Sequence, residues 1–343
     1  MNKLVELFDE IESTKTKDIK LLFITRYLKK DVKKSSKMLD KYLFKTYQID
    51  IDSEIREHLH ELSQEKISYV LKKGYEMTEY DVISDDTQCI MSYSMKNKVL
   101  SFSDVVNNQL DNKSELSRIS SIEELIVSNE EIWAYCIGFE NIEPSNKKVV
   151  YAFRKVQPSK VAIDEKENVK ALSKIIRTHF NTKSKKLEIL KGETINLDKQ
   201  IDCLYYDGEF YILHKGYFEQ IIGLQEEYKE ESKVVVKELE DSGVIKGLEL
   251  VKEEIEKTPA IHKKLVRIRK IGNHKDIDIN KAKEVAEKYG IEIKIENNQI
   301  QIINNKDIEN VLKILSDFYK TGEISGKSYG TYSGKQLTVR KAN

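Results

Sequence analysis

The residues with the clearest potential for chemistry lie near the end of the sequence, where Gly326-Lys327-Ser328 matches the last three positions of a phosphate-binding P-loop. A complete P-loop has the pattern G-x-x-x-x-G-K-[ST] between a buried strand and a helix, because backbone N–H groups and the helix N-terminus must converge on the phosphates. Here Gly322 precedes Gly326 by only four positions, so the loop is one residue short. The following segment, YGTYSGKQLTV, is too rich in glycine and β-branched residues to be helical. We therefore expect this loop not to bind or hydrolyse a nucleotide.

Lysines alternate with tyrosines around the same loop, at Lys320, Lys327 and Lys335 and at Tyr319, Tyr329 and Tyr332. Lysine ammonium groups can pair with phosphates, while tyrosine hydroxyls and backbone amides add contacts, as at many nucleic-acid interfaces. The same residues are equally compatible with an ordered C-terminal hairpin that packs on the core. Both interpretations remain open at this point.

Metal-dependent cleavage of nucleic acid would need two or more carboxylates and a lysine around a divalent cation. Asp202 and Glu209 lie on adjoining strands of a predicted hairpin, and Lys215 follows it. The E-x-K spacing of restriction-like nucleases is missing, because Glu209 is followed by Phe210 and Tyr211. We interpret Asp202 as a solvent-facing or capping acid, and a metal-dependent nuclease stays an alternative function.

The cysteines and histidines do not form a recognisable metal or disulfide pattern. Cys89, Cys136 and Cys203 stand far apart without a C-x-x-C motif, so reduced thiols are expected. His58 and His60 are two residues apart on a predicted helix and therefore face different directions. We expect no catalytic constellation, no metal and no cofactor.

The charged residues balance overall, with 58 basic and 58 acidic side chains, but they are unevenly distributed. Residues 257–343 hold 18 basic against 10 acidic residues, whereas residues 224–256 hold 5 against 11. A local basic region is compatible with an anionic partner even in a neutral chain. The candidate contacts to DNA phosphates are Lys263, Lys264, Arg267, Arg269, Lys270, Lys327 and Lys335. The alternative is a dimer contact, in which the acidic segment meets the basic one.

The hydrophobic pattern predicts an α+β fold in which hairpins alternate with helices. Residues 17–28 and 41–51 are predicted strands, and a helix follows that begins at Asp52 or Ser53 and ends at Gly74. These elements and the polar stretch after them give an N-terminal α+β module over residues 1–115, and residues 116–343 form the second domain.

The second domain is more clearly patterned. Residues 130–139 and 147–156 predict a hairpin, and Trp133 is expected in its core with a partner for the indole N–H. Asp207-Gly208 and Asn297-Asn298 predict tight turns between alternating strands. In the segment 166–180, the apolar residues recur near helical spacing and predict a helix, namely Val169, Leu172, Ile176 and Phe180.

In the segment ILSDFYKTGEISGKSYGTYSGKQLT, a predicted helix that ends in an aromatic residue leads to a turn, G-x-x-Y and a Ser-x-Lys-like stretch. This order resembles the closing part of the KwaB-like family of the Kiwa anti-phage defence system. The segment IDCLYYDGEFYILHKGYFEQIIG resembles the family's hairpin and the helix after it, and VYAFRKVQPSK fits the preceding strand. The similarity covers residues 131–338 and depends on the order and spacing of these matches. The second domain is therefore expected to be a KwaB-like domain.

The resemblance implies a DNA-binding effector subunit that acts with a small multi-pass membrane subunit, KwaA, and blocks the replication or expression of phage DNA. No catalytic residues follow from it, and we expect DNA binding without sequence specificity by a homodimer or higher homo-oligomer. The sequence has neither a long apolar run nor a signal-peptide pattern at its start, so we expect a cytoplasmic protein that its partner recruits to the membrane. The alternative is an adaptor that binds its membrane partner or anionic lipid.

Overall fold

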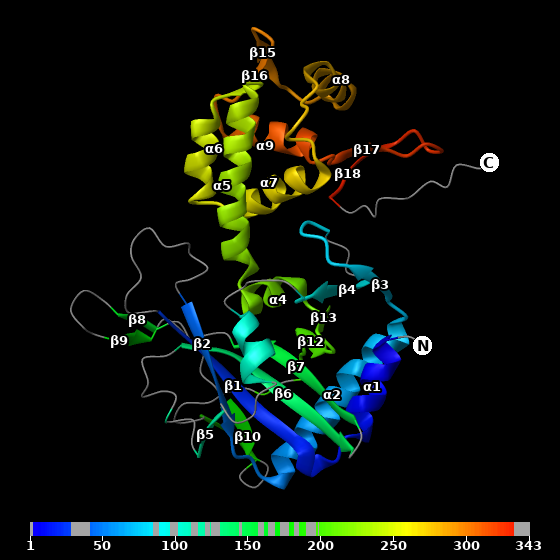
Figure 1. The fold of residues 1–343 in the computed structure, drawn as a ribbon, viewed down its shortest axis with the longest axis vertical. Helices are drawn as coiled ribbons and strands as arrows, with labels where there is room; N and C mark the ends of the chain where they lie inside the picture. The colour runs from blue at the N-terminus through cyan, green and yellow to red at the C-terminus, as the bar shows by residue number, and fades with distance from the viewer. Residues whose placement is uncertain are drawn as a thin grey trace. The chain divides into compact units, whose positions relative to one another are not determined.

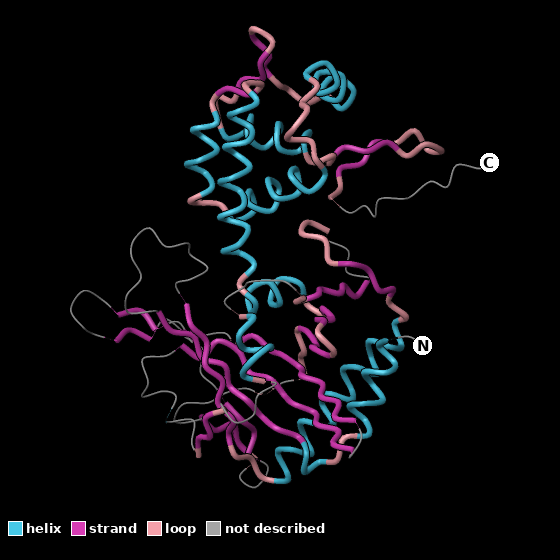
Figure 2. Tube along the Cα trace, in the orientation of Figure 1, coloured by secondary structure: helices cyan, strands magenta, loops and turns pink. Residues whose placement is uncertain are grey.

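The chain divides into two compact units in a computed structural model. Unit 1 comprises residues 1–29, 42–75 and 94–221, and unit 2 comprises residues 30–41, 76–93 and 222–343. The structure describes residues 3–28, 42–84, 89–96, 102–110, 116–120, 124, 131–143, 146–156, 161–163, 169–171, 178–181, 185–189, 197 and 199–332. Both units combine helices with sheets, so the predicted α+β class is confirmed (Figure 2).

A mostly antiparallel sheet forms the centre of unit 1, with the strand order β13-β12-β7-β6-β1-β2-β5 (Figure 1). Its strands are β1 (Ile19–Leu28), β2 (Tyr42–Ile49), β5 (Ser117–Ile119), β6 (Glu131–Glu143), β7 (Asn146–Lys155), β12 (Cys203–Tyr206) and β13 (Glu209–Ile212). Two separate antiparallel pairs also belong to this unit, namely β8 (Val161–Ile163) with β9 (Val169–Ala171) and β10 (Thr178–Asn181) with β11 (Lys186–Ile189).

Two helices, α1 (Lys3–Ser13) and α2 (Ser53–Lys73), pack on each other and on the sheet of unit 1. The short helices η1 (Thr16–Asp18) and η3 (Val105–Gln109) and the helix α4 (Lys215–Ile222) complete the unit. Asp52 begins α2 by accepting a hydrogen bond from the Ile55 N–H at 2.8 Å, and Gly74 ends it with a φ of 62°. The aromatic core includes Phe23, Phe102, Phe139, Phe153, Phe210 and Phe218, whose side chains are fully buried.

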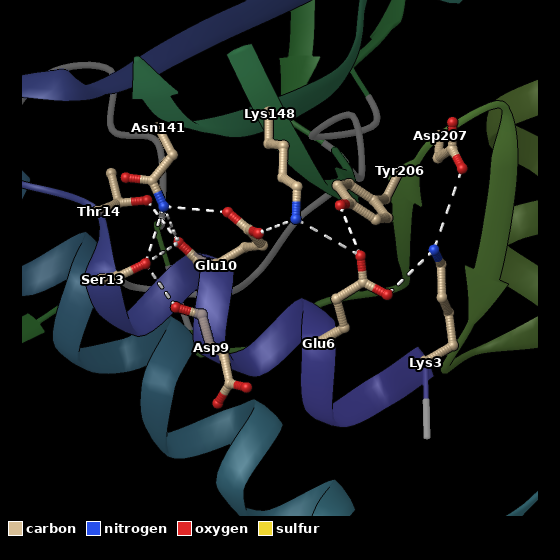
Figure 3. Close-up of polar contacts among 10 residues, drawn as sticks. All are labelled: Lys3, Glu6, Asp9, Glu10, Ser13, Thr14, Asn141, Lys148, Tyr206 and Asp207. Carbon is tan, nitrogen blue, oxygen red and sulfur yellow. Dashed lines mark hydrogen bonds and ion pairs between the residues drawn. The ribbon is translucent and has the colours of Figure 1, made fainter. Parts of the chain in front are cut away.

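A polar network fixes α1 to the strands (Figure 3). The Lys148 ammonium of β7 lies 2.6 Å from the Glu10 carboxylate and 3.7 Å from that of Glu6. The Tyr206 hydroxyl donates to Glu6 at 2.9 Å, and Asn141 donates to both Glu10 and Ser13. The hydrogen bond from Tyr206 lowers the pKa of Glu6, and the Glu10 carboxylate raises the pKa of Lys148. The Lys148 ammonium attracts the carboxylates of Glu6 and Glu10, and this attraction stabilises the contact between α1 and the sheet.

Unit 2 is mainly helical (Figure 1). Its helices are α5 (Leu224–Ser242), α6 (Leu248–Ile255), α7 (Pro259–Ile271), α8 (Ile279–Tyr289) and α9 (Asn305–Leu315). Its strands are β3 (Glu76–Glu79), β4 (Cys89–Ser94, with Ser94 assigned to unit 1), β14 (Ile245–Lys246), β15 (Lys294–Glu296), β16 (Gln299–Gln301), β17 (Tyr319–Thr321) and β18 (Ser328–Gly330). Apolar residues of all five helices share one core, which includes Val236, Leu239, Val251, Leu265, Ile268, Ala282, Val311 and Leu312.

The tight turns predicted from the sequence are confirmed. Asp207 and Gly208 have φ values of 51° and 80° between β12 and β13, and Asn297 and Asn298 have 51° and 58° between β15 and β16. Positive φ at both central residues is the requirement of a type I′ hairpin, which asparagine, aspartate and glycine tolerate.

Two parts of the structure differ from the sequence analysis. The predicted helix over residues 166–180 is wrong at its described residues, because β9 and β10 pair there with neighbouring strands instead. The division between residues 115 and 116 falls inside unit 1, because β1 of the N-terminal region pairs with β6. Cross-strand pairing between distant segments therefore groups residues that local patterns assign to separate modules.

Candidate nucleic-acid interface

The Lys- and Tyr-rich loop at the end of the described chain forms an antiparallel hairpin. Tyr319 pairs with Gly330, and Thr321 pairs with Ser328. A helix precedes the hairpin and a second strand follows its turn, so the loop over residues 322–327 has no helix N-terminus to offer a phosphate. The structure therefore contains the C-terminal hairpin that was one of the two interpretations of this segment. The loop lacks the preceding buried strand and the following helix of a P-loop.

The end of α8 supports one side of the hairpin. The Tyr289 and Tyr319 rings are stacked with a centroid distance of 5.3 Å and an interplanar angle of 26°. The Tyr289 hydroxyl also forms a 2.7 Å hydrogen bond with the Thr321 hydroxyl. A Cβ at Gly330 would lie 2.5 Å from the Phe318 ring, so only glycine allows this close approach of strand and ring. These contacts hold the hairpin against α8, in addition to the pairing of its two short strands.

Arg267 of α7 anchors the base of the hairpin from beneath. Its Nε donates to the Ser316 carbonyl and its Nη1 to the Tyr332 carbonyl, both at 3.0 Å. Nη1 also lies 3.6 Å from the Asp81 carboxylate, and the residue is only 7% exposed. The predicted phosphate ligand Arg267 is thus a buried positioning residue in this structure.

The other basic residues of α7 do not share one surface. Arg269 pairs with Glu231 at 3.6 Å and with Glu238 at 3.3 Å, so the basic and acidic segments meet within unit 2. Burial lowers the pKa of Lys264, which is half-buried near Glu309. Four further predicted contacts differ in their position, since Lys263 is half-buried, Lys270 and Lys327 are exposed, and Lys335 lies outside the described residues.

Lysines of α8 and α9 lie over aromatic rings next to the hairpin. The Lys288 Nζ lies 5.3 Å from the Tyr289 ring centroid, and the Lys313 Nζ lies 5.2 Å from that of Phe318. Phe318 in turn makes an edge contact with Tyr319. We call the resulting set the hairpin surface, which consists of Lys288, Tyr289, Lys313, Tyr319, Lys320, Lys327 and Tyr329.

The hairpin surface has an excess of positive charge. Acids also lie beside it, among them Glu309, which pairs with Lys313 at 2.7 Å, the exposed Glu323 of the turn, and Glu284, one helical turn before Lys288 on α8. The hydrogen bond from Lys313 lowers the pKa of Glu309. Lysine and tyrosine alternation in the sequence indicated the hairpin part of this surface. It gave no signal for Lys288 and Lys313, which only the packing of α8 and α9 brings there.

The carboxylates considered for metal-dependent cleavage are not brought together. Asp202 is 1% exposed, and it accepts hydrogen bonds from Arg154 Nη1 at 2.8 Å and from the Lys155 N–H at 2.7 Å. The interpretation of Asp202 as a solvent-facing acid is therefore wrong. Glu209 lies at the opposite end of the hairpin, beside the turn, where it accepts from the Tyr211 hydroxyl at 3.1 Å.

Lys215, the third member of that set, begins α4. Among the described residues, no group of three or more histidine, cysteine, aspartate or glutamate side chains is placed to hold a metal ion. The described part of unit 1 therefore offers no metal centre at the carboxylates that the sequence singled out.

Trp133 lies at a bulge of β6, where the pairing with β1 shifts register. Its indole N–H donates to the Ile221 carbonyl at 3.0 Å, which confirms the expected partner. Two cations lie close to the ring, with the Arg26 guanidinium carbon 3.5 Å and the Lys155 Nζ 3.7 Å from a ring centroid. Burial lowers the pKa of Lys155 to about 8. Sequence patterns gave no signal for this cation–aromatic cluster.

Within the described residues, no helix combines the length and the apolar character needed to cross a lipid bilayer.

Comparison with known proteins gives one match. No curated protein and no solved structure matched the chain. A family model described as Kiwa protein KwaB-like matches residues 129–325, which is more than half of the 343 residues and includes strands of the sheet, all of α5 to α9 and the first half of the hairpin. The chain thus belongs to the KwaB-like family of Kiwa proteins.

Proposed function

We propose that this protein is a DNA-binding effector of anti-phage defence, and that it contacts DNA phosphates through the hairpin surface without strong sequence preference. The observation that carries the proposal is that Lys288 of α8 and Lys313 of α9 lie over the aromatic rings of Tyr289 and Phe318, beside a hairpin that carries two more lysines. Membership of the KwaB-like family supports a role in the Kiwa system.

The chemistry of the surface favours phosphates over base edges. Lysine ammonium groups act as point charges, which provide affinity for any sequence, whereas base readout typically uses the fixed donor geometry of arginine, asparagine or glutamine. In the part of unit 2 that forms this surface, the described cations are lysines, and Arg267 is occupied by backbone carbonyls. Binding of this kind has dissociation constants of about 10⁻⁴ to 10⁻⁶ M at physiological salt.

The family context extends the proposal to a partner. We propose that the DNA-bound effector acts with a KwaA-like membrane subunit, which recruits it to the inner face of the membrane, and that binding blocks replication or expression of phage DNA. An effector that recognises phosphates can act on many phages, because every duplex presents the same backbone.

Fluorescence anisotropy with a labelled duplex of random sequence, titrated from low to high salt, tests the DNA-binding step. The expected result is binding that weakens steeply with salt and that scrambled sequences reproduce. A parallel measurement with magnesium and gel analysis of the DNA shows whether cleavage occurs. Salt-insensitive binding, a strong preference for one sequence, or cleavage that depends on magnesium would contradict the proposal.

A matched pair of charge reversals locates the surface. Lys288→Glu with Lys327→Glu reverses two charges on the hairpin surface, and Lys246→Glu with Lys294→Glu reverses two exposed lysines of β14 and β15. Both variants change the net charge equally, so a general electrostatic effect would weaken binding by the same factor. We expect at least about tenfold weaker binding only for the first variant. Equal losses would show that the hairpin surface is not the binding site.

A further inference from the structure

The turn of the β17–β18 hairpin presents a fully exposed apolar side chain. Ile324 is fully exposed, with a relative exposure of 104%, while the next most exposed large apolar residue among those described is Ile303 at 57%. The hairpin projects from the helices of unit 2, with this turn at its far end (Figure 1). Ile324 gains nothing from the core of unit 2, and burial against a partner would remove its apolar surface from water.

Backbone hydrogen bonds give the turn a fixed shape that does not involve Ile324. The Gly322 N–H donates to the Lys327 carbonyl at 2.9 Å, and the Gly326 N–H donates to the Gly322 carbonyl at 2.8 Å. Gly326 has a φ of 64°, which lets the chain reverse immediately after the tip. The turn is therefore ordered before any ligand binds, so burial of Ile324 would cost little conformational entropy.

The surroundings of Ile324 suit a nucleic-acid duplex. Lys320 lies on the first strand of the hairpin and Lys327 is exposed in the turn that carries Ile324, so lysine charge is close to the tip where it would enter a groove. A two-stranded ribbon is narrow enough for the major groove, and proteins that distort DNA place apolar side chains between neighbouring base pairs. A single branched side chain fills such a gap between bases.

A lipid bilayer is a poorer match for the same tip. Membrane-surface segments use a broad apolar face, whereas Ile324 stands between the polar residues Glu323 and Ser325, both of which are exposed. Inserting the tip into the acyl region would also remove the Glu323 carboxylate from water. The apolar area thus corresponds to one base step rather than to a membrane.

We propose that the hairpin tip is a wedge that inserts Ile324 between bases, and that the preferred ligand is DNA with a locally broken stack, such as a bulged or mismatched duplex. This inference rests on the proposed DNA binding and assigns the form of DNA that binds best. Unstacking costs energy in an intact duplex, and this cost is smaller where a base is already unpaired. The wedge therefore discriminates by deformability rather than by sequence.

The test compares two duplexes of the same sequence, one fully paired and one with a single unpaired base at its centre. We expect the parent protein to bind the bulged duplex about tenfold more tightly, because its base stack is already open and the wedge does not have to unstack it. Ile324→Ser should bind both duplexes equally and keep the salt-dependent affinity for the paired one. Ile303→Ser, the matched control at another exposed isoleucine, should keep the preference.

A 2-aminopurine beside the unpaired base reports on stacking directly. Its fluorescence should rise when the parent protein binds and should not rise with Ile324→Ser. Circular dichroism and thermal unfolding should be the same for the parent and the variant, because the replaced side chain has no contact in the core.

The outcomes separate the wedge from DNA binding itself. If the parent binds neither duplex, the proposed function fails, and the wedge fails with it. If the parent binds both duplexes with equal affinity and steep salt dependence, DNA binding stands and the wedge is overturned. Binding to phosphatidylglycerol vesicles that Ile324→Ser abolishes, without any preference for the bulged duplex, would also overturn the wedge and would assign the tip to membrane.

Discussion

Arg267 donates a 3.0 Å hydrogen bond from its guanidinium to the backbone carbonyl of Tyr332, which is 65 residues further along the chain. With the bond to the Ser316 carbonyl, it ties both ends of the hairpin to one helix. Arg267, which the sequence analysis predicted to contact phosphate, therefore acts by positioning the hairpin that carries Lys320 and Lys327. This distinction leads to different expectations for variants of the two kinds of residue.

Arg267→Lys should loosen the hairpin while keeping the charge. An ammonium cannot reproduce the fork that bonds two carbonyls at once. We expect amide hydrogen exchange in β17 and β18 to accelerate by at least about tenfold, since local opening becomes easier. Lys270→Gln, an exposed position on the same helix, is the control and should leave this exchange unchanged. Equal protection in both variants would show that Arg267 does not hold the hairpin.

Lys327→Gln should change the salt dependence of DNA binding. Each lysine–phosphate contact contributes about 0.9 to the slope of log affinity against log salt for duplex DNA. We expect the slope to fall by about that amount, whereas Lys246→Gln should not alter it. An unchanged slope for Lys327→Gln would remove this residue from the interface.

The Gly326-Lys327-Ser328 triplet should not bind nucleotides, because its turn joins two antiparallel strands. Calorimetry with magnesium-ATP and magnesium-GTP is expected to give no heat of specific binding. Micromolar binding that disappears in Lys327→Ala would contradict this prediction.

Asp202→Asn should destabilise unit 1 strongly. The carboxylate is buried and accepts from Arg154 and from the Lys155 N–H, so an amide weakens the ion pair and brings its own NH₂ group against one of these donors. A loss of about 3 kcal/mol in the free energy of unfolding is expected, measured by urea denaturation. Glu209→Gln replaces a more accessible acid beside the turn and should cost less than about 1 kcal/mol. Similar stabilities of the two variants would contradict the structural role of Asp202.

The pH dependence of Trp133 fluorescence should report the titration of Lys155. Trp133 is the only tryptophan in the sequence, and the Lys155 ammonium lies 3.7 Å from its ring centroid. Burial lowers the pKa of Lys155 to about 8, so the emission should change with a midpoint near that pH. Lys155→Met should abolish the transition. A transition that persists in this variant would assign it to another group.

The same titration affects stability in a defined direction. An unfolded lysine has a pKa of about 10.4, so between about pH 8 and pH 10 the unfolded chain binds more protons than the folded one. The free energy of unfolding should therefore gain a contribution from Lys155 as the pH rises through this window, and that contribution is absent below it. Lys155→Met should lack the rise.

Local chemistry made part of the fold predictable. Asp207-Gly208 and Asn297-Asn298 identify their turns because few other residues accept positive φ at both positions. Asp52 and Gly74 likewise mark the ends of α2. Each of these signals lies within a few residues of the structure that it determines.

The candidate site was less predictable because its contacts join distant segments. Arg267 and Arg269 look alike in the run KKLVRIRK, yet one bonds to the hairpin and the other to acids of α5. Because they are two positions apart, they point to different sides of α7, and this direction rather than their chemistry decides which partners each one meets. Trp133 similarly gains its two cations from β1 and β7, and the pattern of β6 alone contains no trace of them.

The position of β1 in the sheet has a consequence for synthesis of the chain. β1 pairs with β2 on one side, but its other edge pairs with β6, and the paired residues Arg26 and Glu131 are 105 positions apart. At typical translation rates, the partner strand emerges roughly 5 to 20 seconds after β1. During this interval the apolar β1–β2 hairpin has an open edge, which can pair with other chains. Substitutions that delay the closure of β1 on β6 should therefore reduce the yield of folded protein even where they leave its equilibrium stability unchanged.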